Sequence, residues 1–458
     1  MKKIISTLLI ISLTGMNFLP AFAKGEVKTS SKKEAKTQKA RTVRLNYINL
    51  DWWEDYDDPY LTEYILKAFE NNQDLKITTL QTEESKQRTR LQLAKELPNL
   101  SVGVSPILYK LPGVNSTDGA FAVPILANYE IDLFLKNRDK TRSSKKAYEA
   151  DKIRERAAYI AIASAVGSTY YNIVKLDKLI ELQQDLIKDR ENIYQLMKMS
   201  NEVGIVSTAD LTKADKARTS AKADMYDLKK NRIALLNSLA VLTGDSPNNI
   251  EEFKRISYDE ITKEKPIPKE ISSQIITQRP DYLVAEKMVE KAGIDVRVAK
   301  KEFLPNLNII GLFTFLSDSN NTSMNWNNTI AALAGSAMLQ LFSGGSKIAN
   351  LKINKLRYEQ ILQDYYKTNL TAIKEVNDSL SGLKLDNEKY LTNKRTLAME
   401  EKDFGYTQSQ YDAGVSSYLD LLQKRENLIS VKKLVTSSKI DCQIDQISLY
   451  KAVGASKI

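Results

Sequence analysis

The segment Phe121 to Leu133, FAVPILANYEIDL, alternates between two kinds of side chain. One face of it is apolar and consists of Phe121, Val123, Ile125, Ala127, Tyr129, Ile131 and Leu133, whereas the other carries Glu130 and Asp132. Such alternation indicates a β-strand with different surroundings on its two sides, and a tilted membrane strand needs about 9–11 residues. The segment predicts a membrane strand whose two acids face a water-filled lumen, with a strand of a soluble β-sandwich as the alternative.

The first residues predict an exported protein. Lys2 and Lys3 precede an apolar run over residues 4–19, and the Ala-Phe-Ala at 21–23 is a cleavage signal. Residues 1–23 are therefore expected to be a secretory signal peptide. No cysteine follows the apolar run, so no lipid anchor is expected at the new N-terminus. We find no second run of about 18 apolar residues, so a chain that enters a membrane is expected to use strands.

The formal net charge of +10 is concentrated near the N-terminus. Residues 24–44 hold eight basic residues against Glu26 and Glu34, and with Lys2 and Lys3 they account for most of the excess. No basic patch remains on the body of the chain, so no nucleic-acid partner is expected. The segment 24–44 is poor in apolar residues and is expected to be disordered.

The sequence contains no histidine and one cysteine, Cys442. An internal disulfide is therefore excluded, as are Ser-His-Asp and Cys-His catalysis, and the commonest metal ligand is missing. We expect no enzyme activity, no cofactor and no metal site.

The chain contains two copies of one unit of about 200 residues. Leu-Pro-Asn-Leu at 97–100 recurs at 304–307, and the pattern Gly-x-x-Ser-x-x-Asp-Leu recurs from Gly204 to Gly414. The expected division is repeat 1 over residues 45–250, an equatorial linker over 251–269 and repeat 2 over 270–458.

Each repeat is expected to contain the same elements in the same order. A helical segment (57–96; 270–303) precedes a strand hairpin (99–134; 306–342) and a long helical run (137–202; 346–412). A seven-residue step of Leu179, Leu186 and Ile193 in the first run indicates coiled-coil packing. The long helices are expected to end at Gly204 and Gly414. Ser207 and Ser417 are then expected to cap the next helices, and Asp210 and Asp420 to lie in their first turns.

Four strands cannot close a barrel, and an open sheet edge in lipid leaves backbone groups without partners. Two chains would give eight strands and a filled interior, whereas three would give twelve strands and a lumen. We therefore expect a mainly α fold with membrane β: a homotrimer that shares a twelve-strand β-barrel, four strands per chain, continued by a long periplasmic α-helical barrel.

Several ordered fragments carry a family resemblance. They are Trp-Trp-Glu-Asp-Tyr at 52–56, Tyr-Glu-Ile-Asp-Leu-Phe at 129–134, Arg-Pro-Asp at 279–281 and Tyr-x-x-Gly at 411–414. Through them, residues 45–458 resemble the TolC-like outer membrane efflux proteins, and within these the NodT-type outer membrane factors.

The resemblance implies an outer-membrane channel with a large periplasmic portion, the exit duct of a tripartite efflux or secretion system. Its implied partners are two further copies of the chain, outer-membrane lipid, a periplasmic adaptor protein and an inner-membrane transporter. It also implies a periplasmic gate at Asp420, Tyr411 and Asp210, and adaptor-facing helix tips at Gly204, Ser207, Gly414 and Ser417. Gln423 and Ser416 depart from the family pattern at positions where some relatives carry a second acid and an arginine latch.

Three functional hypotheses can be compared. A passive channel explains both the helices and the alternating strands. A periplasmic coiled-coil adaptor or scaffold explains the helices alone, and it would wash off membranes with salt. The sequence contains no motif that supports an enzyme. For Asp210 and Asp420, helix capping without a gating role is the alternative. The exported substrate and the transporter class are not predicted.

Overall fold

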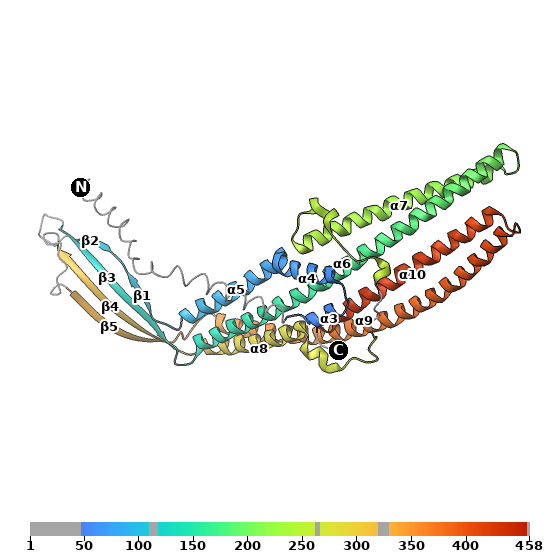
Figure 1. Cartoon of the computed structure of the whole chain (residues 1–458). Coiled ribbons are helices and arrows are strands. Elements are labelled where there is room, and N and C mark those ends of the chain that lie inside the picture. Colours follow the sequence, from blue (N-terminus) through green and yellow to red (C-terminus); the bar gives the residue numbers. More distant parts are fainter. Residues whose placement is uncertain (1–46, 110–117, 262–265, 319–328, 456–458) are drawn as a thin grey trace. The chain divides into compact units, whose positions relative to one another are not determined.

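The computed structural model describes residues 47–109, 118–261, 266–318 and 329–455 (Figure 1). The chain divides into two units, residues 1–52 and 53–458, and the sheet and the long helices belong to the second. The helices and strands are α3 (Leu50–Glu54, which begins in the first unit), α4 (Pro59–Asn71), α5 (Gln73–Ala94), β1 (Asn99–Val102), β2 (Ser105–Tyr109), β3 (Asp118–Ile131), α6 (Lys136–Glu202), α7 (Thr208–Thr243), η1 (Pro247–Glu252), η2 (Tyr258–Glu260), η3 (Ser273–Gln278), α8 (Pro280–Lys301), β4 (Asn306–Asp318), β5 (Thr329–Met338), α9 (Ser346–Asp412) and α10 (Tyr418–Ala452).

The strands form one antiparallel sheet in which β1 and β2 share an edge position, followed by β3, β4 and β5. The predicted strand 99–109 is thus split in two, opposite Pro124 of β3. Proline has no N–H to give to the ladder, and the Gly103 N–H bonds instead to the Pro124 carbonyl at 2.9 Å.

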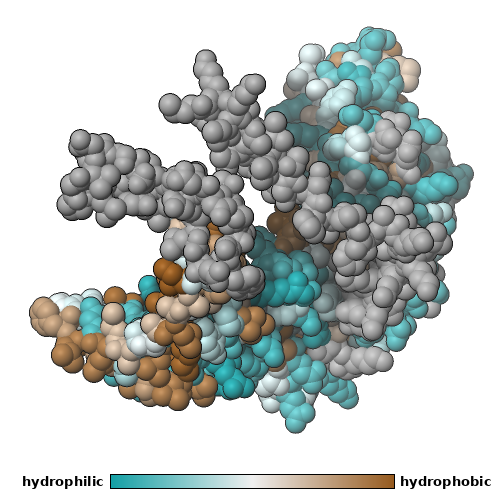
Figure 2. Space-filling view, turned by 90° about the vertical axis from the view of Figure 1, so that its left-hand side faces the viewer, coloured by the Kyte–Doolittle hydropathy of each residue, from teal (hydrophilic) through white to brown (hydrophobic). Residues whose placement is uncertain are grey.

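One face of this sheet is apolar at most of its strand positions, with Ser317 and Thr329 as polar exceptions at one end. The register pairs Ile125 with Val102 on one side and with Phe313 on the other, and Phe313 with Ala331. Directly paired residues share a face, so the apolar face predicted for β3 continues over its neighbours. It comprises Leu100, Val102, Val123, Ile125, Ala127, Tyr129, Ile131, Leu307, Ile309, Gly311, Phe313, Phe315, Ala331, Leu333, Gly335 and Ala337. Figure 2 shows hydrophobic residues gathered over the sheet.

In the single chain the apolar face is exposed along the two edge strands and half-buried at most of its positions on β3 and β4. Leu333 is 79% exposed and Leu100 is 69% exposed. Among the described residues, the strands pack extensively on one another and not on the helices. The sheet is also not closed, because β1 with β2 and β5 form its two edges.

The helical part consists of two antiparallel hairpins, α6 with α7 and α9 with α10, whose tips lie away from the sheet (Figure 1). α6 and α9 each have 67 residues, or roughly 100 Å at 1.5 Å per residue. α6 also packs on α8 and α10, which joins the two hairpins. In the described part of the chain, no helix has an apolar stretch long enough to cross a bilayer.

The predicted helices 57–96 and 270–303 are each interrupted. The first breaks at Asn72, which leaves the helical region (ψ 130°) and whose side chain caps α5 through the Leu75 N–H. In the second, Pro280 starts α8 after the short 3-10 helix η3. These breaks set the joint where the last turns of α7 and α10 pack.

Each of those helices is followed by a glycine with positive φ that packs closely against the helix break of its own repeat. A Cβ on Gly244 (φ 75°) would lie 2.7 Å from the backbone oxygen of Asn71, and a Cβ on Gly454 (φ 67°) would lie 3.0 Å from Pro280 Cδ. Close approach and positive φ both require glycine here. The two equivalent glycines thus form matching joints in the two repeats.

A buried cluster surrounds Trp53, which is fully buried and meets the ring of Tyr450 edge-on at 5.3 Å. A Cβ on Gly167 would approach Trp53 to 2.7 Å, so α6 packs directly on this ring. The cluster holds Trp53, α6 and the end of α10 together.

Candidate functional site: the helix tips

The first tip joins α6 to α7 and is closed by hydrogen bonds. Gly204 has φ 77°, and the Ile205 N–H reaches the Ser200 carbonyl at 2.8 Å, a helix-ending motif that favours glycine. Ser207 then caps α7, since its Oγ accepts the Asp210 N–H at 3.1 Å. The capping role predicted for Ser207 is confirmed.

The second tip, between α9 and α10, repeats this geometry. Gly414 has φ 75°, the Val415 N–H bonds to the Gln410 carbonyl at 2.8 Å, and Ser417 Oγ accepts the Asp420 N–H at 3.1 Å. The ring of Tyr411 lies 5.6 Å from that of Tyr418, across the tip. Capping by Ser417 is confirmed as well.

The two acids have different partners. Asp210 accepts the Ser207 hydroxyl at 2.7 Å and pairs with Lys213 at 3.0 Å. Asp420 accepts the Ser417 hydroxyl at 2.6 Å and the Ser417 N–H at 3.2 Å, and the residue in the place of Lys213 is Gln423. The hydrogen bond from the serine holds the pKa of each carboxyl below its ordinary value. Both are therefore ionised at neutral pH, but only the first is neutralised by a cation of its own helix.

The predicted gate residues do not meet within one chain. Among the described residues, Asp210 bonds within its own tip, as does Asp420, and Tyr411 contacts Tyr418.

The tips also expose apolar residues that the sequence analysis did not single out. Ile205 and Val415 are each 78% exposed, and Val203 is 69% exposed. A Cβ on either tip glycine would meet no atom within 4 Å. Their equal spacing from Gly204 and Gly414 was the signal that could have identified Ile205 and Val415.

The two strand acids lie at the base of the sheet. Glu130 pairs with Lys136 at 2.8 Å. Asp132, predicted to lie on the strand, follows the end of β3 at Ile131 and accepts the N–H groups of Asn137 and Arg138 at 3.1 and 2.8 Å. The start of α6 supplies donors to the Asp132 carboxylate, which explains why the strand ends before it.

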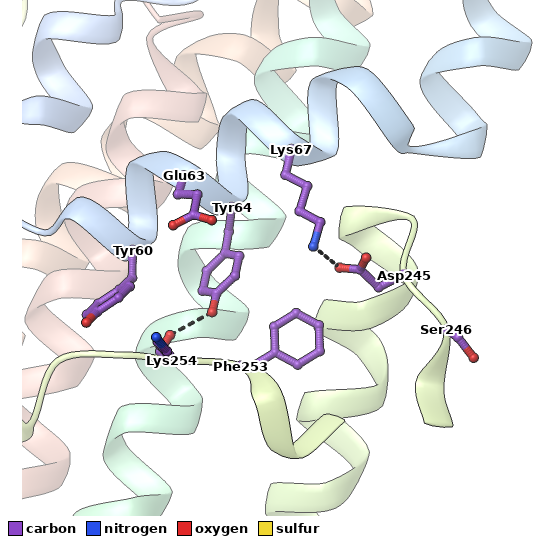
Figure 3. A pocket seen from close by; sticks show the side chains of 8 residues that line it. All are labelled: Tyr60, Glu63, Tyr64, Lys67, Asp245, Ser246, Phe253 and Lys254. Carbon is purple, nitrogen blue, oxygen red and sulfur yellow. Dashed lines mark hydrogen bonds and ion pairs between the residues drawn. The ribbon is translucent and has the colours of Figure 1, made fainter. Parts of the chain in front are cut away.

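A pocket of about 340 Å³ lies between α4 and the segment after α7 (Figure 3). Lys67 and Asp245 form an ion pair of 2.8 Å across it, and the Tyr64 hydroxyl donates to the Lys254 carbonyl at 2.7 Å. These contacts join α4 to the linker and give the pocket a structural role. In the ranges that the structure describes, no group of three Cys, Asp or Glu residues is placed to hold a metal ion.

Comparison with known proteins identifies the family. The model described as "Outer membrane efflux protein" matches residues 65–245 and 271–455. The cation efflux system protein CusC of Escherichia coli O157:H7 is 24% identical over 458 residues, covering 99% of this chain and 98% of CusC. The toluene efflux pump outer membrane protein TtgC of Pseudomonas putida is 25% identical over 417 residues, covering 88% of this chain and 84% of TtgC.

Solved structures agree with this assignment. The Campylobacter jejuni CmeC outer membrane channel has a TM-score of 0.82 and 26% identity, covering 89% of this chain and 88% of CmeC. The Neisseria gonorrhoeae MtrE outer membrane channel, solved in its open state, has a TM-score of 0.77 at 23% identity, covering 87% and 89%. The chain therefore belongs to the outer membrane efflux protein family.

Proposed function

We propose that three copies of this chain close a twelve-strand barrel in the outer membrane and form the exit duct of a tripartite pump. The observation that supports this most strongly is the sheet, with one apolar face and two free edges in the single chain. Lipid can cover the apolar face, and pairing of β5 with the β1–β2 edge of the next copy satisfies the edges.

Exposed apolar residues on the helices support a ring of copies. They lie on helices of both repeats: Leu80 and Leu91 on α5, Tyr226 on α7, and Leu370 and Leu385 on α9. Exposed apolar residues on both repeats of one chain suit a head-to-tail contact between copies, which closes into a ring when the rotation permits. The helices would then continue the barrel wall into the periplasm.

We propose that the tips gate this duct. Asp420 would form a ring of three uncompensated carboxylates, with Asp210 and Tyr411 of adjacent tips beside it. Glu130 and Asp132 would face the lumen near the base of the barrel. The duct would perform no chemistry and would select its cargo by width and charge.

The partners proposed are a periplasmic adaptor and an inner-membrane transporter. The open space beside Gly204 and Gly414 and the exposed Ile205 and Val415 support a docking surface at the tips. We assign no cargo, because the relatives named for cations and for toluene have nearly the same sequence identity to this chain, 24% and 25%.

Two measurements test the proposal. Membranes washed with salt and then extracted with detergent should release the chain in the detergent step, and crosslinking should then give a trimer. The purified trimer should conduct ions in planar bilayers. A chain that washes off with salt as a monomer would instead support the periplasmic scaffold.

A further inference from the structure

The interface between α6 and α10 joins the hairpin of repeat 1 to the hairpin of repeat 2. Because the two helices belong to different hairpins, opening of this interface would let the two hairpins move apart. We call its cross-linking residues the seam: Lys175 with Asp441 at 2.9 Å, Asp189 with Arg425 at 3.1 Å, Arg190 with Glu426 at 3.2 Å, and Lys433, which donates to Gln183. Leu182, Leu186 and Ile429 form an apolar cluster within it.

Asp189 is the least well satisfied member of the seam. Its side chain is 1% exposed, and within the described part of the chain its Oδ2 atom accepts no hydrogen bond. The partner is Arg425, whose Nε is 3.1 Å away in an ion pair without hydrogen-bond geometry and whose side chain is 43% exposed. A buried carboxylate is costly unless it is both paired and hydrogen-bonded.

The charged groups around Asp189 do not remove that cost. They are Asp185 and Lys188 of α6 and Arg425 and Glu426 of α10. The helices packed on either side direct their charges to other partners: Arg218 and Lys222 of α7 bond to Glu191, and Asp403 of α9 bonds to Lys424. Burial, opposed by Arg425 and aided by Asp185 and Glu426, raises the pKa of Asp189 to about 6.

The raised pKa gives the direction of the linkage between protonation and opening. If the seam opens, Asp189 enters water and its pKa returns to the ordinary value of an aspartate. The closed seam therefore binds the proton more tightly than the open one. Protonation stabilises the closed seam, and this stabilisation is lost as the pH rises through about 6.

We propose that Asp189 is a proton-sensitive control of the seam: its protonation tightens the contact between the two hairpins, and its ionisation loosens that contact. The proposal rests on the gating role proposed above for the tips and names a regulator of it. At neutral pH the Asp189–Arg425 pair therefore destabilises the closed seam relative to its protonated form.

Hydrogen–deuterium exchange of the detergent-solubilised full chain tests the seam without reference to conduction. Peptides from 182–190 and 422–430 would be followed at pH 5.0 and pH 7.5, with rates corrected for intrinsic exchange. In the wild type, the opening equilibrium should be about tenfold larger at pH 7.5 than at pH 5.0. Asp189→Asn, which imitates the protonated acid, should be protected at both values. Arg425→Gln should open more than wild type at pH 7.5.

Asp185→Asn is the matched control, because it removes the same charge one turn away on the exposed side of α6. It should keep a pH difference, but a smaller one than wild type, because Asp185 is one of the charges that raise the pKa of Asp189. An Asp189→Asn protein that keeps the full difference, or that exchanges faster than wild type at pH 7.5, would overturn the proposal. Arg425→Gln gives a second test: exchange as slow as wild type at pH 7.5 would also contradict it.

Planar-bilayer recordings separate this inference from the proposed function. Open probability should fall between pH 7.5 and 5.0 in the wild type and should be low at both values in Asp189→Asn. The expected exchange pattern in a chain that carries no current would support the seam and contradict the duct. Currents whose pH dependence is the same in wild type and Asp189→Asn would contradict the seam control alone.

Discussion

The four glycines at the ends of the helical hairpins fall into two pairs with opposite surroundings. At the equatorial joints, Gly244 and Gly454 press against the backbone of the opposite element, whereas Gly204 and Gly414 at the tips have open space beside them. All four have a positive φ of 67–77°. A glycine with positive φ is thus used both in a closely packed joint at the equator and in an unobstructed turn at the tip.

This contrast places the rigid and the movable parts of the chain. Gly244 packs against the end of α4 and Gly454 against the start of α8, so rotation of a hairpin at its joint would be opposed by close packing. The tips are held by hydrogen bonds of their own turns. Motion of the hairpins should therefore pivot about the equator and be largest at the tips.

Replacement of Gly244 by alanine should have the largest effect. The new Cβ meets the Asn71 backbone at 2.7 Å and also requires a positive φ, so we expect a loss of about 3–5 kcal/mol from strain and overpacking together. Gly454→Ala, whose nearest contact is 3.0 Å from Pro280, should cost less. Thermal unfolding of the solubilised protein, followed by circular dichroism, measures the order of the two.

Gly204→Ala and Gly414→Ala are the matched controls. They carry the same positive φ without a steric neighbour, so each should cost about 1–2 kcal/mol. Tip variants that unfold as readily as Gly244→Ala would break the distinction between joint and tip.

The sequence predicted the joints less well than the tips. Gly-x-x-Ser-x-x-Asp is a local signal, because a helix end and a helix cap are made by residues close together in the chain, and both turns formed as expected. The wedge of Gly244 against Asn71 depends on residues far apart in sequence, so no local motif predicted it. In the same way, the alternation of side chains predicted the apolar face of β3. The split of the first strand could not be predicted, because it depends on which residues lie opposite Pro124 in the sheet.

The proposed gate distinguishes the two tips by charge. Asp420 has no cation in its first turn, whereas Asp210 is paired with Lys213. In planar bilayers, Asp420→Asn should raise conductance and weaken block by divalent cations about tenfold, because a ring of three charges disappears. Asp210→Asn should change block much less. Equal effects of the two variants would argue against an acidic gate at the second tip.

Exchanging Lys213 and Gln423, the residues three positions after the two acids, tests the same difference between the tips. Gln423→Lys would give the second tip the ion pair of the first, so block by divalent cations should weaken, by less than in Asp420→Asn because an exposed pair neutralises only part of the charge. Lys213→Gln should strengthen block slightly by leaving Asp210 unpaired. Changes in the opposite directions would show that the pair does not set the local charge.

The smallest effect is expected from the capping serines. The Ser417 hydroxyl is the first cause of the lowered pKa of Asp420, and Ser207 has the same role for Asp210. A lowered pKa means that the charged form stabilises the folded tip above the ordinary pKa of aspartate, and that this contribution is lost as the pH falls through the lowered value. Block by divalent cations should weaken on acidification as Asp420 is protonated. In Ser417→Ala this loss of block should occur at a higher pH than in wild type, while block at pH 7 should be unchanged. Ser207→Ala should shift the loss of block less, because Lys213 also lowers the pKa of Asp210. Titration of block between pH 3 and 7 measures both shifts, and loss of block at the same pH in Ser417→Ala as in wild type would mean that Asp420 does not carry the block.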